Sequence, residues 1–269
     1  FTTIKLVGKR VDKMIIKDAV AMKCAFGENP KRCYGQASKK SPLTRMAVAA
    51  LLRELLFKTQ RYMQDKEEGK NPGFDMKLEA MIPVLRREIP WRQHAHRADD
   101  IGTALRLADE FGYDLVLDHG PEAHVLADVL ADRGIPVLIG PLLTSRSKVE
   151  LRRRSMENPG KLAAAGVEIS IITDHPVVPI NFLIYQAALA MKEGLDREAA
   201  LRAVTINPAK VLGLANRIGS LETGKDADVV LWSGDPLDVM QRALTVWIGG
   251  REVYRYDTET RTQVVADRE

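Results

Sequence analysis

The chain has 269 residues, which is enough for one barrel-sized domain or for a barrel with a small appendage. Hydrophobic residues make up 45% and charged residues 28%, the balance of an ordinary globular protein. No apolar run approaches the ~20 residues that a membrane span requires. The net charge of +4 comes from scattered basic residues with only 6% aromatics, which argues against nucleic-acid binding. We therefore expect neither a nucleic acid nor a membrane as partner.

The two cysteines, Cys24 and Cys33, cannot build a disulfide framework, and neither belongs to a CxxC pair. One of them lies in an apolar run, and the mixed, charged start of the sequence carries no secretory signal. These features favour a reduced, cytoplasmic protein without a cysteine metal site.

Helix and strand signals alternate over the first two thirds of the chain. Residues 13–26 predict a strand that ends near Lys23, followed by a loop at 27–30. Helices are then predicted over 41–62, 76–85, 98–111, 121–132 and 159–165, and strands over 91–96, 113–119, 136–140 and 167–174. This alternation, with short glycine turns, predicts an α/β fold with a parallel sheet and right-handed crossovers.

The pattern changes beyond Pro179. Helices are predicted over 182–191, 197–205 and 208–212, and short strands over 229–232, 245–248 and 251–254. The last two strands are joined at Gly249-Gly250, a hairpin turn. We predict a barrel portion over 1–215, the strands of a small β-sandwich over 216–256, and a polar, frayed tail over 257–269.

Polar residues follow four of the predicted strands: Lys23, His94, His119 and Asp174. The carboxyl ends of successive parallel strands are where a (β/α) barrel assembles its active site. Two imidazoles, a carboxylate and a lysine that converge there predict a divalent metal, with zinc the expected ion, that activates water.

The histidines differ in their predicted roles. His94 and His96 alternate along one strand and share a face, so both can point inward. We predict His94 as the metal ligand and His96 as a contact to substrate or solvent. His119 is predicted as the second ligand, because its register at a strand end matches that of His94, and Gly120 after it lets backbone or a ligand approach closely. His124 lies within a predicted helix and is interpreted as a surface or supporting residue.

Asp174 ends the most apolar strand, where a carboxylate must be paired, hydrogen-bonded or bound to metal. We predict that it binds metal and serves as general base, with capping of the following segment as the alternative. Lys23, within an apolar run, either reaches the mouth of the site or is used chemically. If carbamylated, it could bridge two metal ions. Glu28, a carboxylate a few residues later in the loop, competes with Lys23 as the site residue of this segment.

These residues resemble the amidohydrolase superfamily, in the branch of imidazolonepropionase-like and prolidase-like enzymes. The resemblance covers residues 14–256 and is carried by 22–32 (MKCAFGENPKR), 94–101 (HAHRADDI), 118–120 (DHG), 172–176 (ITDHP), 205–209 (TINPA), 219–228 (GSLETGKDAD) and 246–251 (VWIGGR). It implies a metal-dependent hydrolase that cleaves a cyclic or linear amide C–N bond of a small molecule. It leaves open whether one or two metal ions are bound. Arg97, His175 and Arg32, with His96 and Glu28, are the candidates for holding the substrate.

The family pattern opens with a His-x-His pair on the first barrel strand, whereas the five histidines here lie at 94, 96, 119, 124 and 175. The resemblance therefore implies a partial (β/α)8 barrel, about strands four to eight, followed by the β-sandwich appendage. We expect the chain to be the carboxyl-terminal part of a larger enzyme. Its open sheet edges should pair with the amino-terminal segment or with another copy. The alternative from another class is a catalytically inactive binding or assembly module with the same fold.

Overall fold

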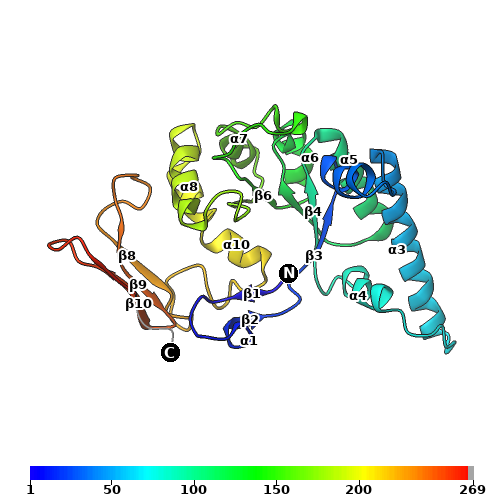
Figure 1. Ribbon diagram of the computed structural model, residues 1–269, viewed down its shortest axis with the longest axis horizontal. Helices are drawn as coiled ribbons and strands as arrows, with labels where there is room; N and C mark the ends of the chain where they lie inside the picture. The colour runs from blue at the N-terminus through cyan, green and yellow to red at the C-terminus, as the bar shows by residue number, and fades with distance from the viewer. Residues whose placement is uncertain (266–269) are drawn as a thin grey trace.

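Five parallel strands form the central sheet of the computed structural model, which describes residues 1–265. The sheet order equals the chain order, β3-β4-β5-β6-β7. Figure 1 labels β3, β4 and β6 of this sheet. The strands are β3 (Met22–Ala25), β4 (Trp91–Ala95), β5 (Leu115–His119), β6 (Val137–Ile139) and β7 (Ile169–Ile171). The predicted parallel α/β sheet is confirmed. Within residues 1–265 the barrel is not closed, because β3 and β7 are both edges of the sheet.

Helices connect the parallel strands. The connecting elements are α2 (Glu28–Pro30), the π-helix η1 (Lys31–Ala37), α3 (Arg45–Glu67), α4 (Met76–Leu85), α5 (Ala98–Phe111), the 3₁₀ turn η2 (Ala123–Leu126), α6 (Ala127–Asp132), the 3₁₀ turn η3 (Val149–Leu151) and α7 (Asn158–Ala164). Local signals set their ends: the Thr44 hydroxyl accepts from the Ala47 N–H at the start of α3, and Gly112, at a φ of 73°, ends α5. In the described part of the chain, none of the helices combines the length and the apolar character that crossing a bilayer requires.

The chain after β7 forms a helical layer and then a second sheet. The helices are η4 (Ile180–Phe182), α8 (Leu183–Lys192), α9 (Arg197–Arg202) and α10 (Ile206–Val211). The antiparallel sheet, in the order β11-β10-β9-β8, consists of β8 (Val229–Trp232), β9 (Ala243–Ile248), β10 (Arg251–Tyr256) and β11 (Gln263–Val265). In Figure 1 α8 and α10 lie between this sheet and the parallel strands. The predicted tail over 257–269 thus contains a strand, β11, while residues 266–269 lie outside the described part.

The prediction of one strand over residues 13–26 is wrong. The segment divides into the end of α1 (Val11–Met14), β2 (Ile15–Lys17) and β3. Strand β2 pairs with β1 (Thr3–Ile4) in a separate antiparallel pair. The interruption falls at Ala19, whose φ of 48° is not that of a strand, and the Asp18 carboxylate accepts the Ala19 N–H there. Apolar content alone could not reveal this break, because Ile15 to Met22 is apolar on both sides of it.

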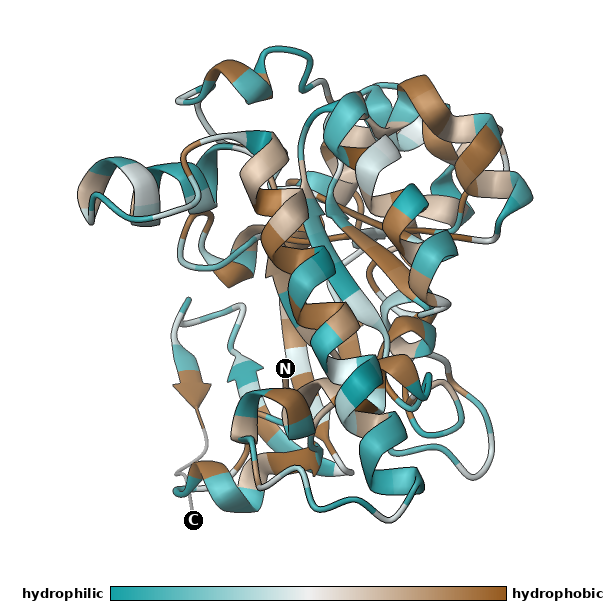
Figure 2. Ribbon diagram, turned by 90° about the vertical axis from the view of Figure 1, so that its right-hand side faces the viewer, coloured by the Kyte–Doolittle hydropathy of each residue, from teal (hydrophilic) through white to brown (hydrophobic). Residues whose placement is uncertain are grey.

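The hydrophobic core lies between the parallel sheet and the helices that cover it. All five residues of β5 are buried, as expected for a strand covered on both faces. Helix α5 contributes Ile101, Ala104, Leu105 and Ala108, spaced at three and four residues along one face. Figure 2 shows the hydrophobic strands inside and hydrophilic turns on the outer helices. The covered sheet provides a rigid base for the side chains at its carboxyl edge.

Gly140, directly after β6, allows the backbone at that edge to pass close to the backbone of Ile172. Its φ is 141°, and a Cβ added to it would lie 2.1 Å from the Ile172 carbonyl oxygen. We expect Gly140→Ala to lower the free energy of unfolding by more than about 1 kcal/mol, through strain and steric clash. Gly102→Ala is the matched control, because Gly102 lies in α5 with open space around its Cβ position. That change should raise stability by about 0.5–1 kcal/mol. Urea unfolding measures both, and equal effects would contradict the prediction.

Candidate metal centre

Three imidazoles converge at the carboxyl edge of β4 and β5. His94 lies in β4, His96 follows that strand, and His119 is the last residue of β5. The ring centroid of His94 is 4.3 Å from that of His119 and 4.5 Å from that of His96, and the other two rings are 5.4 Å apart. All three side chains are buried. The parallel register brings them together, because Ala95 pairs with His119 in the ladder.

A cavity of about 160 Å³ adjoins the imidazoles. Its lining includes the three histidines, Asn29, Lys148 and Asp174. Asp174 lies beyond the end of β7, in a turn, and its side chain is exposed. His119 and Asp174 both have left-handed backbones, with φ values of 74° and 51°. Non-glycine residues held in this region often mark functional sites, which supports a functional reading of both positions.

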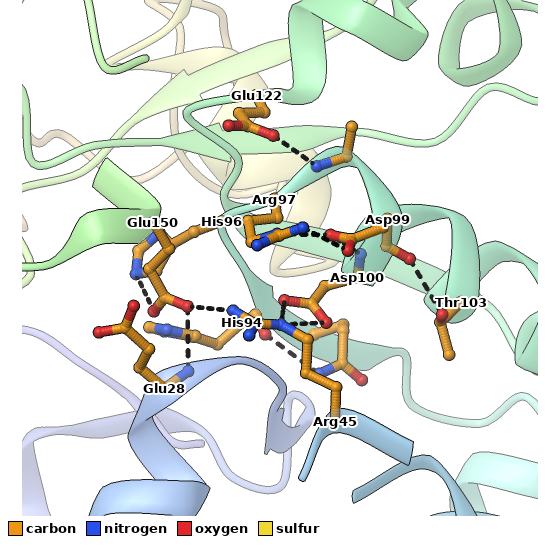
Figure 3. Close-up of polar contacts among 12 residues, drawn as sticks. Glu28, Arg45, His94, His96, Arg97, Asp99, Asp100, Thr103, Glu122 and Glu150 are labelled. Carbon is orange, nitrogen blue, oxygen red and sulfur yellow. Dashed lines mark hydrogen bonds and ion pairs between the residues drawn. The ribbon is translucent and has the colours of Figure 1, made fainter. Parts of the chain in front are cut away.

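Glu150 supplies a buried carboxylate beside the imidazoles. It lies in η3, in the long loop after β6, and is 2% exposed. Its Oε2 accepts from the Glu28 N–H and from Arg45 Nη2, each at 3.0 Å. Arg45 also binds the buried carboxylate of Asp100, so the guanidinium lies between two carboxylates (Figure 3). The other oxygen, Oε1, is 3.6 Å from His96 Nε2.

The donor atoms of this cluster suit a metal ion. Ligand atoms from His94, His96 and Glu150 all lie within 4.8 Å of one another. His96 Nδ1 and Glu150 Oε1 are buried without a hydrogen-bond partner, which is costly unless a ligand completes them. His119 Nδ1 lies 2.7 Å from the Gly140 carbonyl oxygen. Because a carbonyl only accepts, Nδ1 carries the proton and Nε2 keeps its lone pair.

His94 has a competing partner. The Asn29 amide nitrogen lies 3.1 Å from His94 Nε2, and Lys148 Nζ donates to the amide oxygen of Asn29 at 2.5 Å. Because the oxygen accepts from lysine, the nitrogen donates to the imidazole lone pair. A metal at His94 Nε2 would therefore have to displace the Asn29 amide.

Burial keeps the imidazoles neutral. It lowers the pKa of His96 to about 3, with the charge that a protonated His119 would carry as a second cause. The pKa values of His94 and His119 are also lowered, in both cases mainly by burial. Burial raises the pKa of the Glu150 carboxyl, against the hydrogen bond from the Glu28 N–H. Neutral imidazoles at pH 7 are the form that binds metal.

The structure brings three of the four predicted strand-end residues to one cavity: His94, His119 and Asp174. The fourth, Lys23, is elsewhere on the inner sheet face. Its Nζ forms a 2.5 Å ion pair with Asp118 Oδ2, and Arg92 binds the other oxygen of that fully buried carboxylate. Lys23 is therefore paired with a carboxylate and does not line the cavity that adjoins the imidazoles.

The predicted substrate contacts are dispersed. His96 lies in the histidine cluster and lines the cavity. Glu28 is half-buried and holds Glu150 through its backbone N–H. Arg97 pairs with Asp99 at 2.7 Å beside the start of α5, and Arg32 and His175 are exposed. None of these last three lines the cavity. His124 is half-buried in η2.

Sequence reasoning missed Glu150. It follows no strand, and nothing in its immediate sequence distinguishes it from a surface glutamate. Its neighbour Val149 is 73% exposed, whereas Glu150 is buried, which inverts the usual hydropathy rule. The only local signal is its position in the loop after β6, since loops at that edge of a barrel carry active-site residues.

The Amidohydrolase family pattern matches residues 88–256, more than half of the chain. The chain belongs to the amidohydrolase family. The matched region begins just before β4 and ends with β10, so it includes His94, His96, His119, Glu150 and Asp174.

This family assignment agrees with the individual relatives. The crystal structure of an amidohydrolase from Thermotoga maritima is 49% identical, with a TM-score of 0.91 over 94% of this chain and 67% of that one. An amidohydrolase of Hapsidospora irregularis is 27% identical over 246 residues, 85% of this chain and 25% of its own length. An imidazolonepropionase of Thermoplasma acidophilum is 30% identical over 167 residues, 60% of this chain and 38% of its own. The chain thus spans well under half of these two curated relatives.

The buried imidazoles predict that acid destabilises this chain. Because their folded-state pKa values lie below the ordinary 6.5, the unfolded chain binds more protons once the pH falls below 6.5. Stability should therefore be fully present above that pH and lost on acidification. At pH 5.5 His96, with a folded-state pKa of about 3, should have lowered the free energy of unfolding by about 1.4 kcal/mol, and His94 and His119 should lower it further. Urea unfolding with chelator at pH 7.5 and 5.5 measures the loss. His96→Gln should reduce it by one histidine's share, and a pH-independent stability would contradict the prediction.

Proposed function

We propose that this chain carries the reactive part of a metal-dependent hydrolase that cleaves the C–N bond of a small-molecule amide. The observation that carries the proposal is the convergence of three buried, neutral imidazoles and a carboxylate at the rim of a parallel sheet. Membership in the amidohydrolase family supports the reaction class. The relatives named amidohydrolase and imidazolonepropionase support it further.

Two overlapping ligand sets fit a metal ion, with zinc as the proposed ion. The first is His94, His119 and Asp174, which lie in β4, at the end of β5 and after β7, and line one cavity. The second is His94, His96 and Glu150, whose ligand atoms cluster most tightly. Nitrogen and carboxylate donors in this number suit Zn²⁺, and both sets leave room for further ligands. His94 is common to both.

When bound, a divalent ion at these residues would lower the pKa of water to about 7 and polarise the amide carbonyl. The chain's own residues transfer the proton and orient the ligand side chains. Asp174, an exposed carboxylate on the cavity wall, accepts the proton of the attacking water and returns it to the leaving nitrogen. The Gly140 carbonyl holds the His119 ring by its Nδ1–H. Arg45 and the Glu28 N–H orient the Glu150 carboxylate.

Metal content and amide turnover of the same samples test the proposal. The purified chain is stripped with chelator, titrated with Zn²⁺, and assayed against cyclic amides and N-acyl amino acids. We expect about one equivalent of zinc and zinc-dependent turnover. His94→Ala should lose the zinc. A loss in His119→Ala but not in His96→Ala assigns the first ligand set, and the reverse assigns the second. Failure to bind zinc would refute the proposal.

A second candidate is an inactive binding or assembly module with the same fold. The Asn29 amide on His94 Nε2 favours it, because that hydrogen bond satisfies the imidazole without a metal. Asn29→Ala frees the lone pair. If the native chain binds no zinc while Asn29→Ala binds it, the module is the better description.

A further inference from the structure

The loop after β6, residues 140–157, carries two cations to the cavity that adjoins the imidazoles. Both Lys148 and Arg154 line that cavity. Arg154 closes the run Arg152-Arg153-Arg154, a basic cluster that the proposed reaction does not use. Among residues 1–265, no carboxylate forms an ion pair with either Lys148 or Arg154.

Arg154 is the more unusual of the two. Its Nη1 is fully buried and has no hydrogen-bond partner. A guanidinium stays charged at any physiological pH, so it cannot escape this cost by losing its proton. Burial, together with the neighbouring charge of Arg146, lowers the pKa of Arg154, which means that its environment opposes the positive charge. An anion at Nη1 would relieve both effects.

The charge balance of the cavity favours such an anion. Asp174 is the one carboxylate among the described residues of the cavity lining, whereas Lys148 and Arg154 contribute two cations. Lys148 is bound to the neutral amide of Asn29. One positive charge is therefore left without compensation.

The loop is held in place before any ligand arrives. Asn158 is 1% exposed, and its amide nitrogen donates to the carbonyl oxygens of Pro121 at 2.9 Å and Arg153 at 3.0 Å. Arg146 Nη2 donates to the Arg154 carbonyl oxygen at 3.1 Å. These bonds fix the backbone on both sides of Arg154. A guanidinium on a fixed backbone loses little entropy when it binds an anion.

We propose that Arg154 binds a carboxylate group of the substrate, so that the enzyme acts on amides that carry a free carboxylate. The inference rests on the proposed function. One uncompensated guanidinium matches the single charge and planar geometry of a carboxylate, which it can bind through two parallel N–H···O bonds. In the metal-free cavity, a phosphate, with about two charges at pH 7, would exceed the charge available. Arg154 is thus a specificity residue in the lining of the cavity that also holds the proton acceptor.

Binding of small probes to the full chain tests this inference without turnover. The probes are N-acetylglycine, which carries a carboxylate, N-acetylglycinamide, its neutral counterpart, and inorganic phosphate. Calorimetric titration is performed with chelator present, so that no metal can bind the probe. We expect N-acetylglycine to bind about 10- to 100-fold more tightly than N-acetylglycinamide, the range of a charge-assisted pair. Phosphate should bind more weakly than N-acetylglycine.

Arg154→Met should abolish the preference for the carboxylate, and Arg152→Met is the matched control. Arg152 lies in the same loop, is exposed, and does not line the cavity, so its loss should leave the preference unchanged. Thermal unfolding of both variants confirms that they are folded. Equal binding of the two glycine probes to the native chain, an unchanged preference in Arg154→Met, or tighter binding of phosphate would overturn the inference. A chain that prefers the carboxylate but binds no zinc would refute the proposed hydrolase alone.

Discussion

Asp174→Asn should reduce kcat on amide substrates by about 10²- to 10⁴-fold, the usual contribution of a positioned general base. An amide cannot accept the proton that the carboxylate takes from the attacking water. Asparagine is also the appropriate replacement for the backbone, because it tolerates the left-handed conformation that Asp174 adopts at a φ of 51°. The fold should therefore survive the change.

The control for this prediction is the adjacent residue. His175 is exposed and does not line the cavity, so His175→Asn should leave kcat within about twofold, as expected of a surface change away from the site. Zinc content is measured in both variants. Loss of zinc in Asp174→Asn would assign the residue mainly to metal binding. Retained zinc with at least a tenth of the native kcat would exclude the general-base role.

Glu150→Ala should lower the free energy of unfolding by about 3–5 kcal/mol, the cost of breaking a buried ion pair from one side. The carboxylate accepts from Arg45 and from the Glu28 N–H, and both donors would lose that partner. Three segments meet at this side chain: the start of α2, the start of α3 and the loop after β6 (Figure 3). Loss of the carboxylate would therefore loosen the contacts among all three.

Two further variants separate charge from packing. Glu150→Gln keeps the volume and an oxygen for the Glu28 N–H, so it should cost less than Glu150→Ala. Glu54→Ala removes an exposed ion pair with Lys58 on α3 and should change stability by no more than about 0.5 kcal/mol. Urea unfolding in chelator measures all three without a metal contribution. Equal costs for Glu150→Ala and Glu54→Ala would show that the buried pair adds nothing.

The order of elements could be predicted from the sequence because each has a local cause. Buried parallel strands give short apolar runs, and β4 to β7 lie within the predicted ranges. Helix α5 follows the predicted 98–111, because an apolar stripe and a terminal glycine are both local signals. The convergence of His94, His119 and Asp174 could also be predicted, since the carboxyl ends of parallel strands meet at one edge.

Other features depend on partners distant in the chain. The break at Ala19 separates two apolar segments that join different sheets. Lys23 was predicted as a site residue from its apolar surroundings, and the structure adds an ion-pair partner, Asp118, that lies 95 residues away. An apolar run shows that a lysine needs a partner without identifying it.

The sequence by itself determined the alternation of strands and helices, the family, and which strand ends carry reactive groups, because those properties depend on residues that are close together in the chain. Only the tertiary structure decided that Glu150 is buried while Val149 is exposed, and that Arg154 reaches the cavity without a partner. The physical reason is that the burial of a charge depends on where its counter-charge lies. For Glu150 that counter-charge is Arg45, 105 residues earlier in the chain.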